Sequence, residues 1–234
     1  LGAYAGAICL GAGFPWWAGL LAAGASGAIC SWSLSPLLVR LKGAEFAVCS
    51  LCIPLLAATL ARNLETLTGG VAGISVPIPG REIPYSCTLL LLMGTIRIYG
   101  SVYHSRWGRA LRSAAADPMA AAKLGISCKP LRTQALVLGS TLASLAGGIY
   151  PLQSGYVSPE SAFGTEALLS PVVAALMGGS SSTWGPLLGA VLLGLLQELI
   201  LVRFPGGTLW ALGFLLMASG LGLSVRRGWN PSKV

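Results

Sequence analysis

The sequence has few charged residues, and acidic residues are the scarcest of them. Only 9% of the 234 residues are charged, with 15 Lys and Arg against 7 Asp and Glu, whereas about 25% is usual in soluble domains. Hydrophobic residues make up 54% of the chain, and the mean hydropathy is +0.76. So few charges cannot cover the surface of a soluble protein of this size. The net charge of +8 therefore indicates lipid contact and membrane topology rather than nucleic-acid binding.

Groups suited to catalysis or metal binding are also scarce. The acidic residues are dispersed, and no two carboxylates are paired at helical spacing. Six cysteines lie mostly in apolar runs, and the pair Cys49 and Cys52 has no second pair or histidine cluster to complete a zinc site. The only histidine, His104, fits an interfacial position better than a general base, and no G-x-S-x-G motif surrounds a serine. We predict neither an enzyme nor a metal site.

A stretch rich in glycine and serine, residues 178–185 (GGSSSTWG), superficially resembles a phosphate-binding loop. A P-loop needs a lysine that reaches the β- and γ-phosphates, and no lysine is near. A turn between two apolar segments is the simpler interpretation. We therefore expect no cofactor in this chain, so that any ATP and Mg²⁺ would be held by a partner.

Long apolar runs predict an all-α fold, a polytopic transmembrane helical bundle that forms one domain over residues 1–234. About 20 apolar residues cross a hydrocarbon core of about 30 Å as a helix. We predict about eight membrane segments, at 1–14, 17–39, 44–62, 85–103, 132–151, 165–178, 185–203 and 207–224. The first segment is incomplete, because the chain begins at Leu1 inside an apolar stretch, and we expect a truncated, processed or misannotated N-terminus.

The longest polar break is the basic segment, residues 104–132, which holds six of the fifteen Lys and Arg residues. If the basic segment is cytoplasmic, alternation of the spans puts eleven cationic residues inside, against Arg62, Arg81 and Arg203 near the outer face. The opposite orientation would violate the positive-inside rule. We therefore expect a cytoplasmic C-terminus and a cytoplasmic surface on which a soluble partner can dock.

Small residues recur at four-residue spacing, which lets helix backbones approach closely in lipid. The sets are Gly2/Gly6, Ser140/Ser144/Gly148 and Gly185/Gly189. We favour close packing within one subunit over a dedicated contact between subunits.

The loop after the third segment is the best candidate for contact with a solute. Its candidate residues are Asn63, Thr68, Gly69, Gly70 and Gly73. Glycines let backbone N–H groups face a ligand, as broken helix ends in membranes do. An ordinary glycine-rich turn is an equally good interpretation. Glu198 either lines a pathway or, as we favour, lies near the membrane interface.

Short motifs follow one another along nearly the whole chain. They are GAY at 2–4, LKGAEFA at 41–47, Asn63 with LTGGVAGI at 67–74, SRWGRAL at 105–111, AA at 120–121 with GI at 125–126, LAGGIY at 145–150, VSP at 157–159, and MGG at 177–179 with WGPLLGA at 184–190. In this order they resemble the inner-membrane permeases of branched-chain amino-acid ABC transporters of the leucine/isoleucine/valine type. Each motif alone is weak, but their ordered set is specific.

The resemblance implies one permease subunit of an ATP-driven importer in the bacterial plasma (inner) membrane, carrying branched-chain amino acids or a related small polar solute. The implied partners are a homologous second permease, cytoplasmic ATPase subunits and a periplasmic or extracellular solute-binding protein. The resemblance also implies a coupling helix, from about Asp117 to Lys129, seated in a groove of the ATPase. The coupling residues would be Asp117, Ala120, Ala121, Gly125, Ile126 and Lys129.

The basic segment departs from the family pattern at two positions. Pro118 and Ala122 stand where family members usually carry acidic residues, which leaves Asp117 alone. The alternative is therefore an ATPase-independent facilitative channel, or a structural membrane subunit that has lost coupling.

Overall fold

A computed structural model describes residues 1–41, 43–77, 80, 82–179 and 184–203. The chain divides into two compact units, Leu1–Leu168 and Leu169–Val234. Within the described residues the chain is mainly helical, in agreement with the predicted fold class. The predicted segment 207–224 and the C-terminus, expected to be cytoplasmic, lie outside the described residues.

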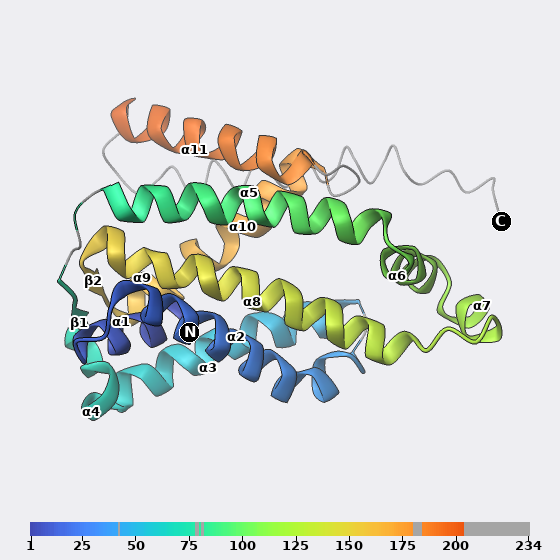
Figure 1. Cartoon of the computed structure of the whole chain (residues 1–234), viewed down its shortest axis with the longest axis horizontal. Coiled ribbons are helices and arrows are strands. Elements are labelled where there is room, and N and C mark those ends of the chain that lie inside the picture. Colours follow the sequence, from blue (N-terminus) through green and yellow to red (C-terminus); the bar gives the residue numbers. More distant parts are fainter. Residues whose placement is uncertain (42, 78–79, 81, 180–183, 204–234) are drawn as a thin grey trace. The chain divides into compact units, whose positions relative to one another are not determined.

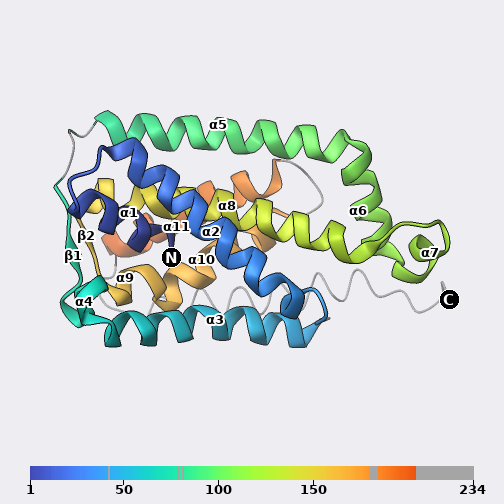
Figure 2. The same ribbon diagram turned by 60° about the horizontal axis from the view of Figure 1, so that its bottom comes forward.

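Four long helices form the body of the first unit: α2 (Trp16–Leu38), α3 (Ala44–Asn63), α5 (Glu82–His104) and α8 (Cys128–Ser154). Each is long and apolar enough to cross a membrane. They alternate in direction along the chain, with the basic segment at one end of the unit and β1, β2 and α4 at the other (Figures 1 and 2). This arrangement confirms the polytopic helical class predicted from the apolar runs.

The remaining apolar helices are shorter. Helix α1 (Gly2–Gly11) has 10 residues and spans about 15 Å, too little to cross a bilayer alone. Helix α10 (Thr165–Gly178) follows α9 in a fifth candidate span, Pro159–Gly178, and α11 (Gly185–Arg203) is the last described helix. Within the described part of the chain, four predicted segments thus reach spanning length, and the predicted segment 165–178 reaches it only together with α9.

Small residues hold α1, α2 and α8 together. The Ser144 hydroxyl on α8 donates a buried hydrogen bond of 2.6 Å to the Ala23 carbonyl on α2. A Cβ on Gly2 would collide with Ser144, and a Cβ on Gly6 would lie 3.3 Å from the Gly148 carbonyl oxygen. The four-residue spacing therefore serves close backbone approach within this chain, as predicted.

The same device joins α10 and α11 in the described part of the second unit. A Cβ on Gly189 of α11 would collide with the Ala174 carbonyl of α10, and a Cβ on Gly178 would collide with the Gly185 carbonyl. Glycine at these positions lets the α10 and α11 backbones touch, which confirms the packing interpretation for the pair Gly185 and Gly189.

The basic segment folds into two short helices. Helix α6 (Arg106–Ala116) begins at Ser105, whose hydroxyl accepts a 3.0 Å hydrogen bond from the Gly108 N–H. Helix α7 (Pro118–Lys123) follows after Asp117. Both lie at the end of the unit where α5 ends and α8 begins (Figure 1). The expected coupling helix is thus shorter than the predicted range, and Lys129 lies in the first turn of α8.

At the opposite end, two loops meet and form what we call the glycine-rich cap. Its first half contains α4 (Glu65–Thr68), the 3₁₀ helix η1 (Gly70–Ala72) and β1 (Ile74–Ser75), and its second half contains β2 (Tyr156–Val157) and α9 (Pro159–Phe163). The two strands pair antiparallel, with Ile74 opposite Val157 and Ser75 opposite Tyr156. The sequence analysis predicted no strand here, because two-residue strands show no alternation.

Beneath the cap lies the main buried cluster of the first unit. It consists of Ala3, Tyr4, Ala7, Leu10, Ala61, Val76, Leu152, Val157 and Phe163. These residues come from α1, α3, α8 and both halves of the cap, so the cap completes the core at this end. Along the spans, in contrast, large apolar side chains such as Leu21 and Leu90 are 65% and 70% exposed, as expected for a surface in contact with lipid or other membrane helices.

Candidate functional site

The first candidate site is the exposed end of the basic segment, which is built by helix capping. Asp117 Oδ1 accepts hydrogen bonds from the backbone N–H groups of Met119, at 2.8 Å, and Ala120, at 3.1 Å. Pro118 occupies the first turn, where a missing N–H costs nothing. The only acidic residue of this segment thus starts α7.

A glycine-based cap ends α7. The Ile126 N–H donates to the Ala121 carbonyl and the Gly125 N–H donates to the Ala122 carbonyl, both at 3.0 Å. Gly125 has a φ of +78°, the left-handed conformation that this pair of bonds requires. The AA-x-x-x-GI motif, from which coupling residues were predicted, therefore encodes a helix stop.

The caps orient α7 so that one side is buried and the other is exposed. Ala121 is only 1% exposed, as is Ala114 of α6, the helix on which α7 packs. Met119 and Leu124 are 75% and 78% exposed. Met119 in α7 and Leu124 at its C-cap are thus two exposed apolar side chains at the end of the basic segment.

Helix α6 connects this surface to the spans. The Trp107 Nε1–H donates a 2.8 Å hydrogen bond to Gln134 Oε1 on α8. The Arg112 guanidinium lies 3.9 Å from the centre of the Tyr103 ring on α5. These two contacts attach α6 to both α5 and α8.

The second candidate site is the glycine-rich cap, which contains or adjoins all the predicted solute-contact residues. Two of them have their side chains bonded within the chain. The Thr68 hydroxyl donates to the Ala61 carbonyl at 2.5 Å, and the Asn63 amide donates to the Thr59 carbonyl at 2.8 Å. These bonds fix the turn after α3.

The three predicted glycines, Gly69, Gly70 and Gly73, all have positive φ values, of 69°, 59° and 71°. A Cβ on Gly73 would also collide with the Val157 carbonyl, and one on Gly69 would collide with the Gly73 carbonyl. Glycine is thus required both by backbone conformation and by space. A contact of these residues with a solute stays a prediction.

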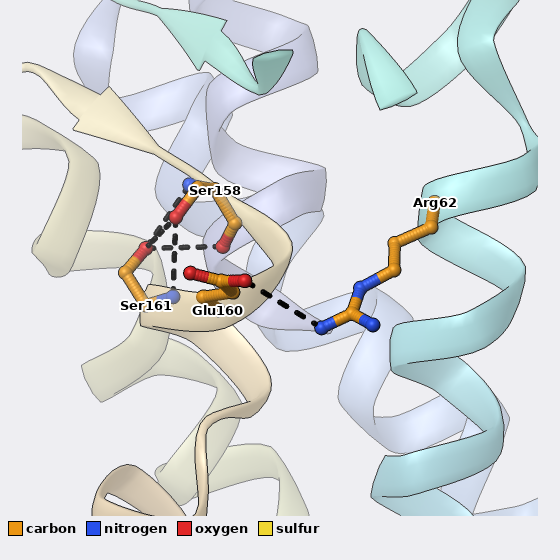
Figure 3. A network of polar contacts seen from close by, with 4 residues as sticks. All are labelled: Arg62, Ser158, Glu160 and Ser161. Carbon is orange, nitrogen blue, oxygen red and sulfur yellow. Dashed lines mark hydrogen bonds and ion pairs between the residues drawn. The ribbon is translucent and has the colours of Figure 1, made fainter. Parts of the chain in front are cut away.

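Side-chain contacts that the sequence analysis did not predict join the two halves of the cap. Arg62 on α3 forms a 3.8 Å ion pair with Glu160 on α9, beside the capping box in which Ser158 and Ser161 bond reciprocally (Figure 3). The Tyr156 hydroxyl donates a 2.6 Å hydrogen bond to the Ala72 carbonyl, 84 residues away. The S-x-x-S spacing of Ser158 and Ser161 could have predicted the capping box. No spacing in the sequence could have predicted the long-range partners.

A groove of about 780 Å³ also lies between α2, α5 and α8 in the first unit. It is lined by Trp32, Ile98, Pro130, Thr133, Gln134, Val137, Leu138, Thr141 and Leu142. None of these side chains is ionisable, so the groove has no acid, base or nucleophile. It is an apolar surface of the spans.

A family model described as branched-chain amino acid transport system / permease component matches residues 1–220 of the chain. The LivM high-affinity branched-chain amino acid transport system permease protein of Escherichia coli strain K12 is 27% identical over 221 residues, covering 80% of this chain and 52% of LivM. LivM of Salmonella typhimurium is 28% identical with the same coverage. The chain spans about half the length of these relatives.

A further relative is the autoinducer 2 import system permease protein LsrC of Yersinia pestis. It is 26% identical over 227 residues, covering 92% of this chain and 63% of LsrC. No solved structure matches the chain.

Proposed function

Since the chain belongs to the branched-chain amino acid transport system / permease component family, we propose that it is a membrane-spanning subunit of an ATP-driven ABC importer. Its cargo is a branched-chain amino acid or a related small polar solute. The multi-pass helical body forms part of the pathway, and ATP and Mg²⁺ are bound by ATPase partners. A homologous second permease and a solute-binding protein complete the transporter in the bacterial plasma membrane.

The observation that carries this proposal is the exposure of two apolar side chains, one in α7 and one at its C-cap. Met119 and Leu124 lie at the end of the unit that also holds the cationic residues of the basic segment. The positive-inside rule favours the cytoplasm for this end. An ATPase that contacts α7 can displace α6, and through α6 the spans α5 and α8.

Co-purification of an ATPase tests the proposal. The protein is expressed with the ATPase, second permease and binding-protein genes that adjoin it, and is isolated through an affinity tag. We expect the ATPase to co-purify, and the reconstituted complex to take up radiolabelled leucine only when ATP is present. Isolation without any ATPase would favour the alternative, a channel or structural subunit that has lost coupling.

A matched pair of substitutions locates the contact. Met119 in α7 and Val71 in η1 of the cap are equally exposed apolar residues, at 75% and 74%. Met119→Asp places a charge in the proposed interface and should abolish ATPase co-purification, because an unpaired charge is costly to bury. Val71→Asp should leave co-purification unchanged. Equal recovery of the ATPase with both variants would contradict the proposed contact.

A further inference from the structure

The hydroxyl group of Tyr4 is buried without a partner. Tyr4 lies on α1 and is only 5% exposed. Its Oη atom is inaccessible to solvent and, alone among the buried side-chain polar atoms of the described residues, has no hydrogen bond. Phenylalanine would fill the same space without the cost of burying an unpaired polar group. A tyrosine at this position therefore requires an explanation beyond packing.

The surroundings of Tyr4 belong to the glycine-rich cap and the helices beneath it. The Tyr4 ring stacks on the Phe163 ring of α9, with ring centres 5.9 Å apart and an angle of 12° between the planes. Val76, Val157 and Leu152 belong to the same buried cluster. The hydroxyl thus belongs to the buried cluster, on helix α1, which lies toward β1 and β2 (Figure 1).

The two halves of the cap are joined by the strand pair, by two further hydrogen bonds that include the Tyr156–Ala72 bond, and by apolar side chains of the buried cluster beneath them. The antiparallel pairing covers two residues on each strand, followed by one 2.9 Å bond from the Val76 N–H to the Gly155 carbonyl. The Arg62–Glu160 ion pair is exposed, at 52% and 83% (Figure 3), and exposed pairs contribute little. The first half continues from α3 and the second from α8. The halves can therefore separate without breaking a long helix, and their separation exposes Val76, Val157 and Phe163 of the buried cluster.

We propose that the glycine-rich cap is a gate for the solute and that the Tyr4 hydroxyl is the hydrogen-bonding group that the open gate presents. When β1 parts from β2, the phenol O–H donates to an acceptor oxygen of the solute, which for an amino acid is its carboxylate. Closure returns the hydroxyl to its unpaired state, so a solute is released rather than retained. This inference rests on the proposed transport function.

Tyr4→Phe tests the role of the hydroxyl in the assembled transporter. Loss of one hydrogen bond to a charged acceptor should lower the maximal rate of ATP-driven leucine uptake by roughly 10-fold. The melting temperature should stay the same or rise, because an unpaired buried hydroxyl is removed. Tyr85→Phe is the matched control, since Tyr85 is 71% exposed at the start of α5, and its uptake should equal that of the wild type.

Wild-type uptake by Tyr4→Phe would overturn the role of the hydroxyl, and a lower melting temperature with slow uptake would show that the group is structural. No uptake by the unsubstituted complex would instead contradict the proposed function itself. The two failures are therefore distinguishable.

A reversible cross-link tests the gate. Ser75 and Tyr156 face each other across the strand pair, so both are replaced by cysteine in a background whose six native cysteines are replaced by serine. Oxidation should abolish uptake, and a reductant should restore it. The single variant Ser75→Cys should be insensitive to both reagents. Full uptake by a completely cross-linked protein would show that the cap does not open between β1 and β2.

Discussion

The two ends of the first unit both depend on glycines with left-handed backbones, but for different reasons. Gly73 in the cap has a φ of +71° and is crowded by the Val157 carbonyl, whereas Gly125 in the basic segment has a φ of +78° and nothing within 4 Å of a Cβ placed on it. The cap is closed by contacts between distant parts of the chain. The basic segment is shaped mainly by neighbouring residues and exposes its apolar side chains.

The two ends of the first unit therefore suit different roles. Local capping sets both ends of α7, and the helix packs on α6, which suits a surface that contacts a partner. The cap consists of short elements from two distant parts of the chain, and the proposed gate opens between them. Substitutions that alter only one of the two ends can therefore test whether their roles differ.

The largest effect is expected from Gly125→Pro. Proline cannot adopt a positive φ and has no N–H to donate to the Ala122 carbonyl, so the end of α7 is lost. We expect ATP-driven uptake to be abolished while membrane insertion is intact, measured by uptake into proteoliposomes and by membrane fractionation.

Gly13→Pro is the control for Gly125→Pro. Gly13 has a φ of +82°, open space around it and an N–H that donates to the Leu10 carbonyl at 3.1 Å. Proline at position 13 therefore imposes the same backbone strain as proline at position 125, but away from the basic segment. We expect the folded fraction of this variant to keep ATP-dependent uptake. Normal uptake by Gly125→Pro would show that α7 does not transmit the ATPase signal.

Alanine substitutions of Gly73 and Gly125 should have intermediate effects on stability, and the two effects should differ in size. Gly73→Ala combines left-handed strain with a collision against β2, and should lower the free energy of unfolding by roughly 2–4 kcal/mol. Gly125→Ala carries the strain alone and should cost about 1–2 kcal/mol. Denaturant titration of the detergent-solubilised protein measures both. Equal losses would mean that crowding at Gly73 relaxes and that the cap is looser than its contacts indicate.

The smallest effect concerns the single carboxylate of the basic segment. Asp117→Ala removes the acceptor for two N–H groups and should lower stability by about 1 kcal/mol, with a few-fold loss of ATPase association. Asp117→Asn keeps an acceptor oxygen and should retain near wild-type association. Loss of the ATPase with Asn as well would show that the charge itself contacts the partner, as the family resemblance implies.

The sequence predicted most boundaries of the spans within a few residues, because apolar length is a local property. The predicted segment 44–62 corresponds to α3 at Ala44–Asn63, and 165–178 corresponds to α10 at Thr165–Gly178. Helix α1 is shorter than its apolar run because Gly13 and Pro15 follow it. The start of α7 was also detectable, since Asp followed by Pro is a strong helix-start signal.

The sequence alone thus determined the membrane class, the family and the position of the basic segment, because hydropathy, charge and ordered motifs are read residue by residue. Tertiary structure decided which residues meet: Tyr4 with Phe163, Arg62 with Glu160, and β1 with β2. These partners are far apart in the chain and occur once each. A single sequence has no period or spacing that could encode them, and only the packing of α1, α3 and α8 brings them together.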